Sequence, residues 1–236
     1  MSQLRIGFQN SGIPALTTGH FLNLLSHLLL SGPEPEIRLG NVLGDVVKGP
    51  LHGVEGASRT DLPAAVLVGV RLHRRIDAFT DAHEIPRRSR GLIAPEWRRF
   101  AGILVDVFYD HALSRNWAQL HPGESLPDFL AAAYRQFEEM DLSGLPADFP
   151  VIIRRMIQGN WLGSYGSQEG IALTLKRMSR RLRRPIALET AAAQLPGIYP
   201  SLERDFLEFW PALREAVTGG PGSAGTVPAG SRTAVD

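Results

Sequence analysis

Two pairs of chemically versatile side chains are spaced four residues apart in apolar surroundings. His73 and Asp77 form the first pair, and Asp106 and Asp110 form the second, with His111 directly after it. Residues at positions i and i+4 share one face of an α-helix, so each pair points one way if its segment is helical. Burying carboxylates and imidazoles without a partner is costly. A divalent metal ion would satisfy them, and such a site would make the chain an enzyme.

An ordinary surface ion pair is the alternative interpretation of His73 and Asp77. Against it, Arg74 and Arg75 already supply the solvent-facing side of this segment with charge. His73 also falls on the same helical stripe as Val70, which indicates an inward-facing position. The sequence therefore favours an inward polar pair.

The two carboxylates of the second pair would repel each other. Asp106 and Asp110 would lie on one face of an apolar helix, where like charges repel and both need solvation, and a shared cation removes that conflict. Asp45, in another short apolar segment, is a further candidate ligand or general base, although taken alone it is better explained as a solvated acid. His27 stands on an apolar helix face, where a lone histidine is more often a hydrogen-bonded core residue than a ligand.

Composition limits the kinds of site that the chain can build. It has 236 residues, of which 44% are hydrophobic, enough for one sizeable core and one domain. It has no cysteine, which excludes disulfides, thiolate metal sites and cysteine nucleophiles. A metal would use His, Asp, Glu or water, which suits Mn, Fe, Mg or Zn rather than a structural zinc cage. The net charge of +1 gives no signal for nucleic-acid binding.

The chain divides into three regions by composition. Residues 1–19 are predicted to be a weakly ordered leader, residues 20–217 a helical domain, and residues 218–236, rich in Gly, Ala, Ser and Pro, a disordered tail. No apolar run reaches the ~18 residues that a membrane span needs. The first residues lack a clean signal peptide. We therefore expect a cytoplasmic protein that does not bind membranes.

The body of the chain predicts an all-α, single-domain helical bundle, because apolar residues recur at helical spacing and strand-like alternation is nearly absent. One predicted helix opens at Asp61–Pro63 and carries His73 and Asp77. The other predicted helices are Phe21–Ser31, Gly40–Lys48, residues 95–120, Ser125–Met140, Pro150–Gln158, Gln168–Leu182 and Pro200–Val217.

Basic residues gather in the second half of this nearly neutral chain. A solvated helix face is the usual explanation of such a run, but arginines also favour carboxylate and phosphate partners. An acidic partner or a phosphorylated ligand is therefore a candidate for this group, which we take as Arg154, Arg155, Arg177, Arg180 and Arg181.

Several segments, in order along the chain, resemble the acyl carrier protein phosphodiesterases, also called acyl carrier protein hydrolases. The paired segments His73–Asp77 (His-Arg-Arg-Ile-Asp) and Asp110–Arg115 (Asp-His-x-Leu-Ser-Arg) are fairly specific for that family. The other matching segments are Asn23–Leu28, Gly40–Asp45 with Lys48–Gly49, Thr80–Asp81, Asp106–His111, Met178–Arg181 and Phe206–Pro211.

The resemblance implies a fold related to the HD-domain phosphohydrolases. It also implies a Mn²⁺-dependent enzyme, with Fe²⁺ or Mg²⁺ as alternatives, that removes 4′-phosphopantetheine from the serine of holo-acyl carrier protein. The implied metal ligands are Asp45, His73, Asp77, Asp106 and His27, and the implied catalytic residues are Asp45, Asp110 and His111. At three positions the family often has a histidine where this chain has Leu29, Arg71 and Asn116.

Two other functions fit the same residues. An HD-like phosphohydrolase of this fold could act on another phosphodiester, such as a nucleotide. A helical binding module without catalytic activity would explain the arginines while leaving the acids without a metal. Activity on small phosphodiesters alone would indicate the first, and the absence of metal binding would indicate the second.

Overall fold

The computed structural model describes residues 23–45, 47, 62–143, 145, 149–180, 182 and 186–219. Within these ranges the chain forms helices and connecting turns and contains no β-strand, which confirms the predicted all-α single domain. The predicted leader, and the predicted tail from residue 220 onward, lie outside the described residues. None of the helices in the described ranges is long and apolar enough to cross a membrane.

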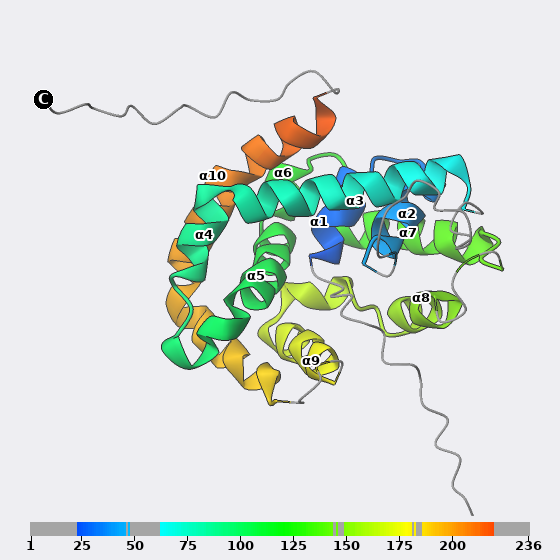
Figure 1. The fold of residues 1–236 in the computed structure, drawn as a ribbon. Helices are drawn as coiled ribbons and strands as arrows, with labels where there is room; N and C mark the ends of the chain where they lie inside the picture. Colours follow the sequence, from blue (N-terminus) through cyan, green and yellow to red (C-terminus); the bar gives the residue numbers. More distant parts are fainter. Residues whose placement is uncertain are drawn as a thin grey trace, which may run out of the picture.

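Figure 1 shows the arrangement of the helices, coloured in chain order. The α-helices are α1 (Leu24–Leu30), α2 (Pro35–Leu43), α3 (Ala64–Ala82), α4 (Glu84–Arg90), α5 (Ala101–Arg115), α6 (Trp117–Leu120), α7 (Leu126–Glu139), α8 (Phe149–Gln158), α9 (Gln168–Ser179) and α10 (Leu195–Thr218). Three short 3₁₀ helices join them, η1 (Pro95–Phe100), η2 (Gly163–Gly166) and η3 (Leu188–Gln194).

Helix α5 forms the centre of the domain. Leu104, Val105, Val107 and Phe108 are completely buried, so this helix is apolar on nearly every side, as expected for a core helix. Helices α1, α4, α9 and α10 all contact it, and α10 also packs against α3 and α4 (Figure 1). The buried polar residues of α5, Asp110 and His111, must therefore be matched by partners from the surrounding elements.

Helices α2 and α3 cross in direct backbone contact, because each has a glycine at the crossing point. A Cβ atom at Gly40 would lie 2.0 Å from the Val66 carbonyl oxygen, and one at Gly69 would lie 2.2 Å from the Ile37 carbonyl oxygen. No side chain fits at either position. The crossing places the C-terminal end of α2 beside the middle of α3, and both helices carry polar residues of interest there.

Several helices differ from the sequence prediction. The single helix predicted over residues 95–120 is divided into η1, α5 and α6. Helix α4 was not predicted, since its polar sequence shows little amphipathic period; the His83 side chain caps it by accepting from the Ile85 amide. Helix α2 begins at Pro35, ahead of the predicted start at Gly40. Helix α10 begins at Leu195 and continues through Pro200, the predicted start, because packing against the core outweighs the loss of one hydrogen bond.

We predict that Gly69→Ala lowers the stability of the fold by about 2–3 kcal/mol, since the added methyl group meets backbone atoms that cannot move aside. In a thermal melt this corresponds to a decrease in Tm of roughly 5–10 °C. Gly197→Ala is the matched control, because nothing lies within 4 Å of a Cβ there. An unchanged Tm for Gly69→Ala would contradict the close crossing.

Candidate active site between helices α1, α2 and α3

Two histidines and two aspartates from three segments of the chain meet beside the α2–α3 crossing: His27 from α1, Asp45 from the end of α2, and His73 and Asp77 from α3. Nε2 of His73 lies 3.0 Å from Asp77 Oδ2 and 3.6 Å from Asp45 Oδ1. Nε2 of His27 lies 3.2 Å from the other Asp77 oxygen, Oδ1. His27, His73 and Asp45 are buried, whereas the Asp77 side chain is 46% exposed, so the cluster opens to solvent at Asp77.

Local packing fixes the two imidazole rings against each other. The rings of His27 and His73 stack with their centroids 4.3 Å apart. Gly44, at the end of α2, makes room for His73, because a Cβ there would lie 2.2 Å from its ring. The Arg74 guanidinium donates to the Val47 carbonyl at 2.9 Å and so ties the segment after Asp45 to α3.

Asn41 determines which nitrogen of His27 carries a proton. The Asn41 amide nitrogen donates to the His27 carbonyl at 2.9 Å and to the Ser31 hydroxyl at 2.8 Å. Its oxygen therefore faces Nδ1 of His27, at 2.7 Å. Because that oxygen can only accept, Nδ1 must carry the proton and donate a hydrogen bond to it. In neutral His27 the lone pair then lies on Nε2, toward Asp77. This buried Nε2 makes no well-formed hydrogen bond in the described part of the chain.

The charges of the cluster follow from burial and pairing. Burial disfavours the charged form of His27, but the contacts with Asp77 and Asn41 outweigh it and raise the pKa of His27. Burial lowers the pKa of His73, and the charge of His27 adds to that effect. Burial alone would raise the pKa of Asp77, but its contacts with the two histidines hold it well below the usual range. Without a metal, the structure therefore favours a His27 imidazolium paired with an Asp77 carboxylate.

The donor atoms of this cluster are of types that bind divalent metals, but in this structure they are not arranged as a set of metal ligands. Imidazole nitrogens and carboxylate oxygens suit Mn²⁺, Fe²⁺ or Mg²⁺ to differing degrees. Among the described residues, however, no three His, Asp or Glu side chains are arranged to hold a metal ion together. Asp77 uses both of its oxygens on the histidines instead.

Asp106 lies on α5 near this cluster without a hydrogen bond to any described side chain or amide. Burial raises the pKa of Asp106 to about 7, opposed by the Arg90 charge and supported by the charges of Asp77 and Asp81. Arg90 is itself bound to Asp81 at 2.6 Å. At neutral pH the Asp106 carboxyl is therefore poised between its protonated and ionised forms.

Asp110, one turn after Asp106, holds the start of helix α1. Its carboxylate accepts from the Leu25 amide at 2.8 Å, from the Ser26 amide at 2.9 Å and from the Ser26 hydroxyl at 2.6 Å. It thus caps α1 from another helix, since the N-cap residue Asn23 makes no capping bond itself. Burial raises the pKa of Asp110 to about 6 despite these bonds. Both carboxylate oxygens of Asp110 thus accept hydrogen bonds from α1, whereas the sharing of a cation with Asp106 stays a prediction.

His111 faces away from the cluster. Its Nδ1 bonds to the Tyr165 carbonyl at 2.6 Å, and its ring meets the edge of the Tyr199 ring. The structure therefore brings together Asp45, His73, Asp77 and His27, places Asp106 nearby, and separates Asp110 and His111 from them by their own partners.

The predicted basic group lies on α8 and α9. Arg154, Arg155 and Arg180 are exposed, and Arg177 lies over the Trp161 ring with its guanidinium carbon 4.8 Å from the ring centroid. Arg181 lies outside the described residues.

One polar residue of the site was missed in the sequence, although a signal was present. Asn41 precedes Asp45 by four residues, the same spacing that identified His73 and Asp77. An amide on the buried face of a short apolar helix needs a partner, just as a carboxylate does.

Together, the fold and the cluster define an all-helical protein with a buried imidazole–carboxylate centre of the kind that hydrolytic enzymes use. Comparison with known proteins identifies the family. Residues 22–213 match the family model described as acyl carrier protein phosphodiesterase.

Relatives carrying the name acyl carrier protein phosphodiesterase cover most of the chain. The protein of Photorhabdus laumondii is 34% identical over 194 residues, which cover 82% of this chain and 94% of that protein. The proteins of Yersinia enterocolitica and Klebsiella pneumoniae are 34% and 33% identical over 192 residues, covering 81% of this chain and 95% of each relative. No solved structure gives a significant match. The chain belongs to the acyl carrier protein phosphodiesterase family, a family of phosphoric diester hydrolases.

The two aspartates of α5 should respond in opposite ways to replacement by asparagine. Asp110→Asn replaces one acceptor oxygen with an NH2 group that faces at least one of the three donors, and we expect it to lower the free energy of unfolding by about 2–4 kcal/mol. In the wild-type protein, folding raises the pKa of Asp106, so the folded state binds a proton more tightly than the unfolded state. Wild type therefore loses stability as the pH rises from about 4 to 7, and Asp106→Asn removes this loss.

The Asp106→Asn variant should therefore match wild type near pH 4 and exceed it by about 1 kcal/mol at pH 8, after allowing for partial exposure of the carboxyl. Denaturant titrations of the metal-free protein at both pH values measure this difference. A stabilised Asp110→Asn variant would show that the contact with α1 is not needed.

Proposed function

We propose that this protein hydrolyses the phosphodiester bond between 4′-phosphopantetheine and the serine of holo-acyl carrier protein, and so regenerates apo-acyl carrier protein. The observation that carries the proposal is the cluster of His27, His73, Asp45 and Asp77 in a member of a phosphodiesterase family. The names of the relatives support the carrier protein as substrate.

A divalent metal, Mn²⁺ with Fe²⁺ or Mg²⁺ as alternatives, is part of this proposal. His27, His73, Asp45 and Asp77 would hold it, and Nε2 of His27, a buried nitrogen that contacts Asp77 at 3.2 Å, would exchange that contact for the ion. The bound ion would supply a polarised phosphate oxygen and a water of lowered pKa. Binding would displace the proton on Nε2 of His27, because Asn41 keeps the other proton on Nδ1.

The protein's own groups would position the substrate and move a proton. Asp45 is the foremost catalytic candidate, since its carboxylate is buried beside His73. Asp106, whose pKa is raised by burial to about 7, could donate a proton to the departing serine oxygen, and it remains a candidate metal ligand as well. Asp77, at the exposed edge, would orient both histidines.

The basic group on α8 and α9 would dock the carrier protein, which is an acidic protein. The exposed guanidinium groups of Arg154, Arg155 and Arg180 can bind surface carboxylates. Val151 and Leu173, both 44% exposed, lie on the same helices and would add apolar contacts. Because exposed charges are screened, this docking should weaken as salt increases.

We predict that the protein, incubated with holo-acyl carrier protein and Mn²⁺, removes the phosphopantetheine mass from the carrier, as followed by intact-mass spectrometry. Asp45→Asn should lower the rate by about 10²–10³-fold, since it removes charge that stabilises the transition state. Asp128→Asn, in the exposed first turn of α7, is the matched control and should keep the wild-type rate.

Two results would contradict the proposal. If the carrier mass never changes while a small phosphodiester is cleaved, the substrate is a different phosphodiester. If Asp45→Asn retains full activity on the carrier protein, the cluster is not the catalytic centre.

A further inference from the structure

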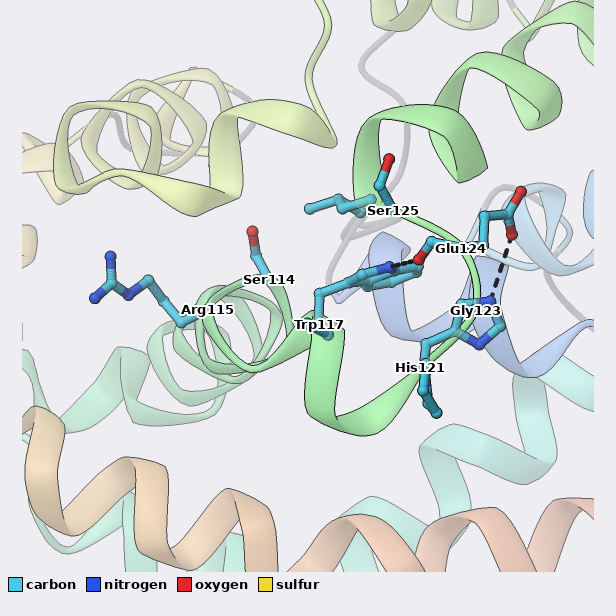
Figure 2. Close-up of a pocket in the computed structure, with 10 residues that line it drawn as sticks. Ser114, Arg115, Trp117, His121, Gly123, Glu124 and Ser125 are labelled. Carbon is cyan, nitrogen blue, oxygen red and sulfur yellow. Dashed lines mark hydrogen bonds and ion pairs between the residues drawn. The ribbon is translucent and has the colours of Figure 1, made fainter.

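A groove crosses the C-terminal end of α5, at a distance from the candidate active site. It consists of two adjoining pockets of about 600 and 450 Å³ that share Arg115 in their walls. The first pocket lies between α6 and the start of α7, with Trp117 as its apolar wall (Figure 2). The second lies between the end of α5, the start of α9 and the start of α10. Ser114 and Gly166 meet where the pockets join, since a Cβ at Gly166 would lie 3.3 Å from the Ser114 hydroxyl.

Arg115 gives the groove a positive charge at its middle. In Figure 2 its side chain extends away from Trp117, and it is exposed. No carboxylate in the described part of the chain lies within ion-pair distance of its guanidinium group. The nearby Glu203 is engaged instead by the Tyr199 hydroxyl at 2.8 Å and the Asn116 amide at 2.7 Å. Arg115 interacts with the Tyr199 hydroxyl but forms no ion pair among the described residues, so its remaining N–H groups can bind an anion from outside the protein.

His111 gives the second pocket a hydrogen-bond acceptor. Its Nδ1 must donate to the Tyr165 carbonyl, which can only accept, so the neutral ring keeps its lone pair on Nε2. Burial lowers the pKa of His111, which favours this neutral form. The ring is only 9% exposed and lines the pocket, and Nε2 has no hydrogen-bond partner among the described residues. A ligand N–H or O–H group would satisfy it.

The ends of two helices add backbone groups to the same pocket. Ser167 caps α9 by accepting from the Gly170 amide, and Gln168, the first residue of that helix, lines the pocket beside it. The first amides of a helix favour negative charge. In α10, Pro200 has no amide proton, so the Pro196 carbonyl loses its usual helical donor, and both prolines line the pocket.

We propose that this groove binds a small organic anion whose chain carries hydroxyl or amide N–H groups. Arg115 and the start of α9 would bind the phosphate or carboxylate, and His111 and the Pro196 carbonyl would accept from the chain. Leu195 and the Tyr199 ring would cover its apolar part. Arg115 lies nine positions after Asp106, about 13 Å along α5, which places the anion-binding end of the groove away from the candidate active site, with His111 between them.

The choice of probe rests on the proposed function, because its released product, 4′-phosphopantetheine, combines a phosphate with a hydroxyl- and amide-bearing chain. The test is a calorimetric titration of the full chain with 4′-phosphopantetheine, with pantetheine and with inorganic phosphate. We expect 4′-phosphopantetheine to bind at least tenfold more tightly than either fragment. Arg115→Gln should weaken this binding at least tenfold.

Two further variants locate the binding and separate it from catalysis. Arg98→Gln, at an exposed arginine of η1 just before α5, should leave the affinity unchanged, and so should Asp45→Asn in the candidate active site. Absence of binding, equal affinity of Arg115→Gln and wild type, or equal affinity for the fragments would each overturn the inference. A loss of binding in Asp45→Asn alone would place the ligand in the active site instead. None of these results depends on turnover, so an inactive protein that binds through Arg115 would refute only the proposed function.

Discussion

The direct backbone contact between α2 and α3 is the constraint on which the rest of the site depends. Gly40 and Gly69 let the two helix axes approach until backbone atoms meet. Only at that separation can Asp45, at the end of α2, reach His73 in the middle of α3. Gly44 then leaves the space that the His73 ring occupies. Gly40, Gly44 and Gly69 thus determine the geometry of the cluster, although they have no side chains that could react or bind.

The charges of Asp77 and of the two histidines determine whether this cluster holds a proton or a metal ion. Asp77 is held by two histidines, and one of them has its proton placed by Asn41. A proton on Nε2 of His27 and a metal ion at the same nitrogen exclude each other, so metal affinity should rise with pH. The cluster is therefore stable without a metal as an ion pair, and its donor atoms suit a metal when the proton leaves. Asp106, beside it, retains a proton that the ion pair does not use.

The sequence predicted those features that local periodicity controls. The inward position of His73 and the all-α fold follow from apolar residues at helical spacing, and the structure confirms both. The partner of Asp110 could not be found in this way, because α1 lies more than eighty residues earlier in the chain. The same limit applies to α10, where tertiary packing carries a helix through Pro200. The relation to HD-domain phosphohydrolases and the roles of the site residues stay predictions.

The central claim is that the cluster beside the α2–α3 crossing binds a divalent metal through Nε2 of His27. Crystals of the protein grown with Mn²⁺, with data collected at the manganese absorption edge, test it directly. We expect an anomalous peak between His27 and Asp77, with the proton of His27 kept on Nδ1 by Asn41. A peak at any other place, or none at full saturation with Mn²⁺, would contradict the claim.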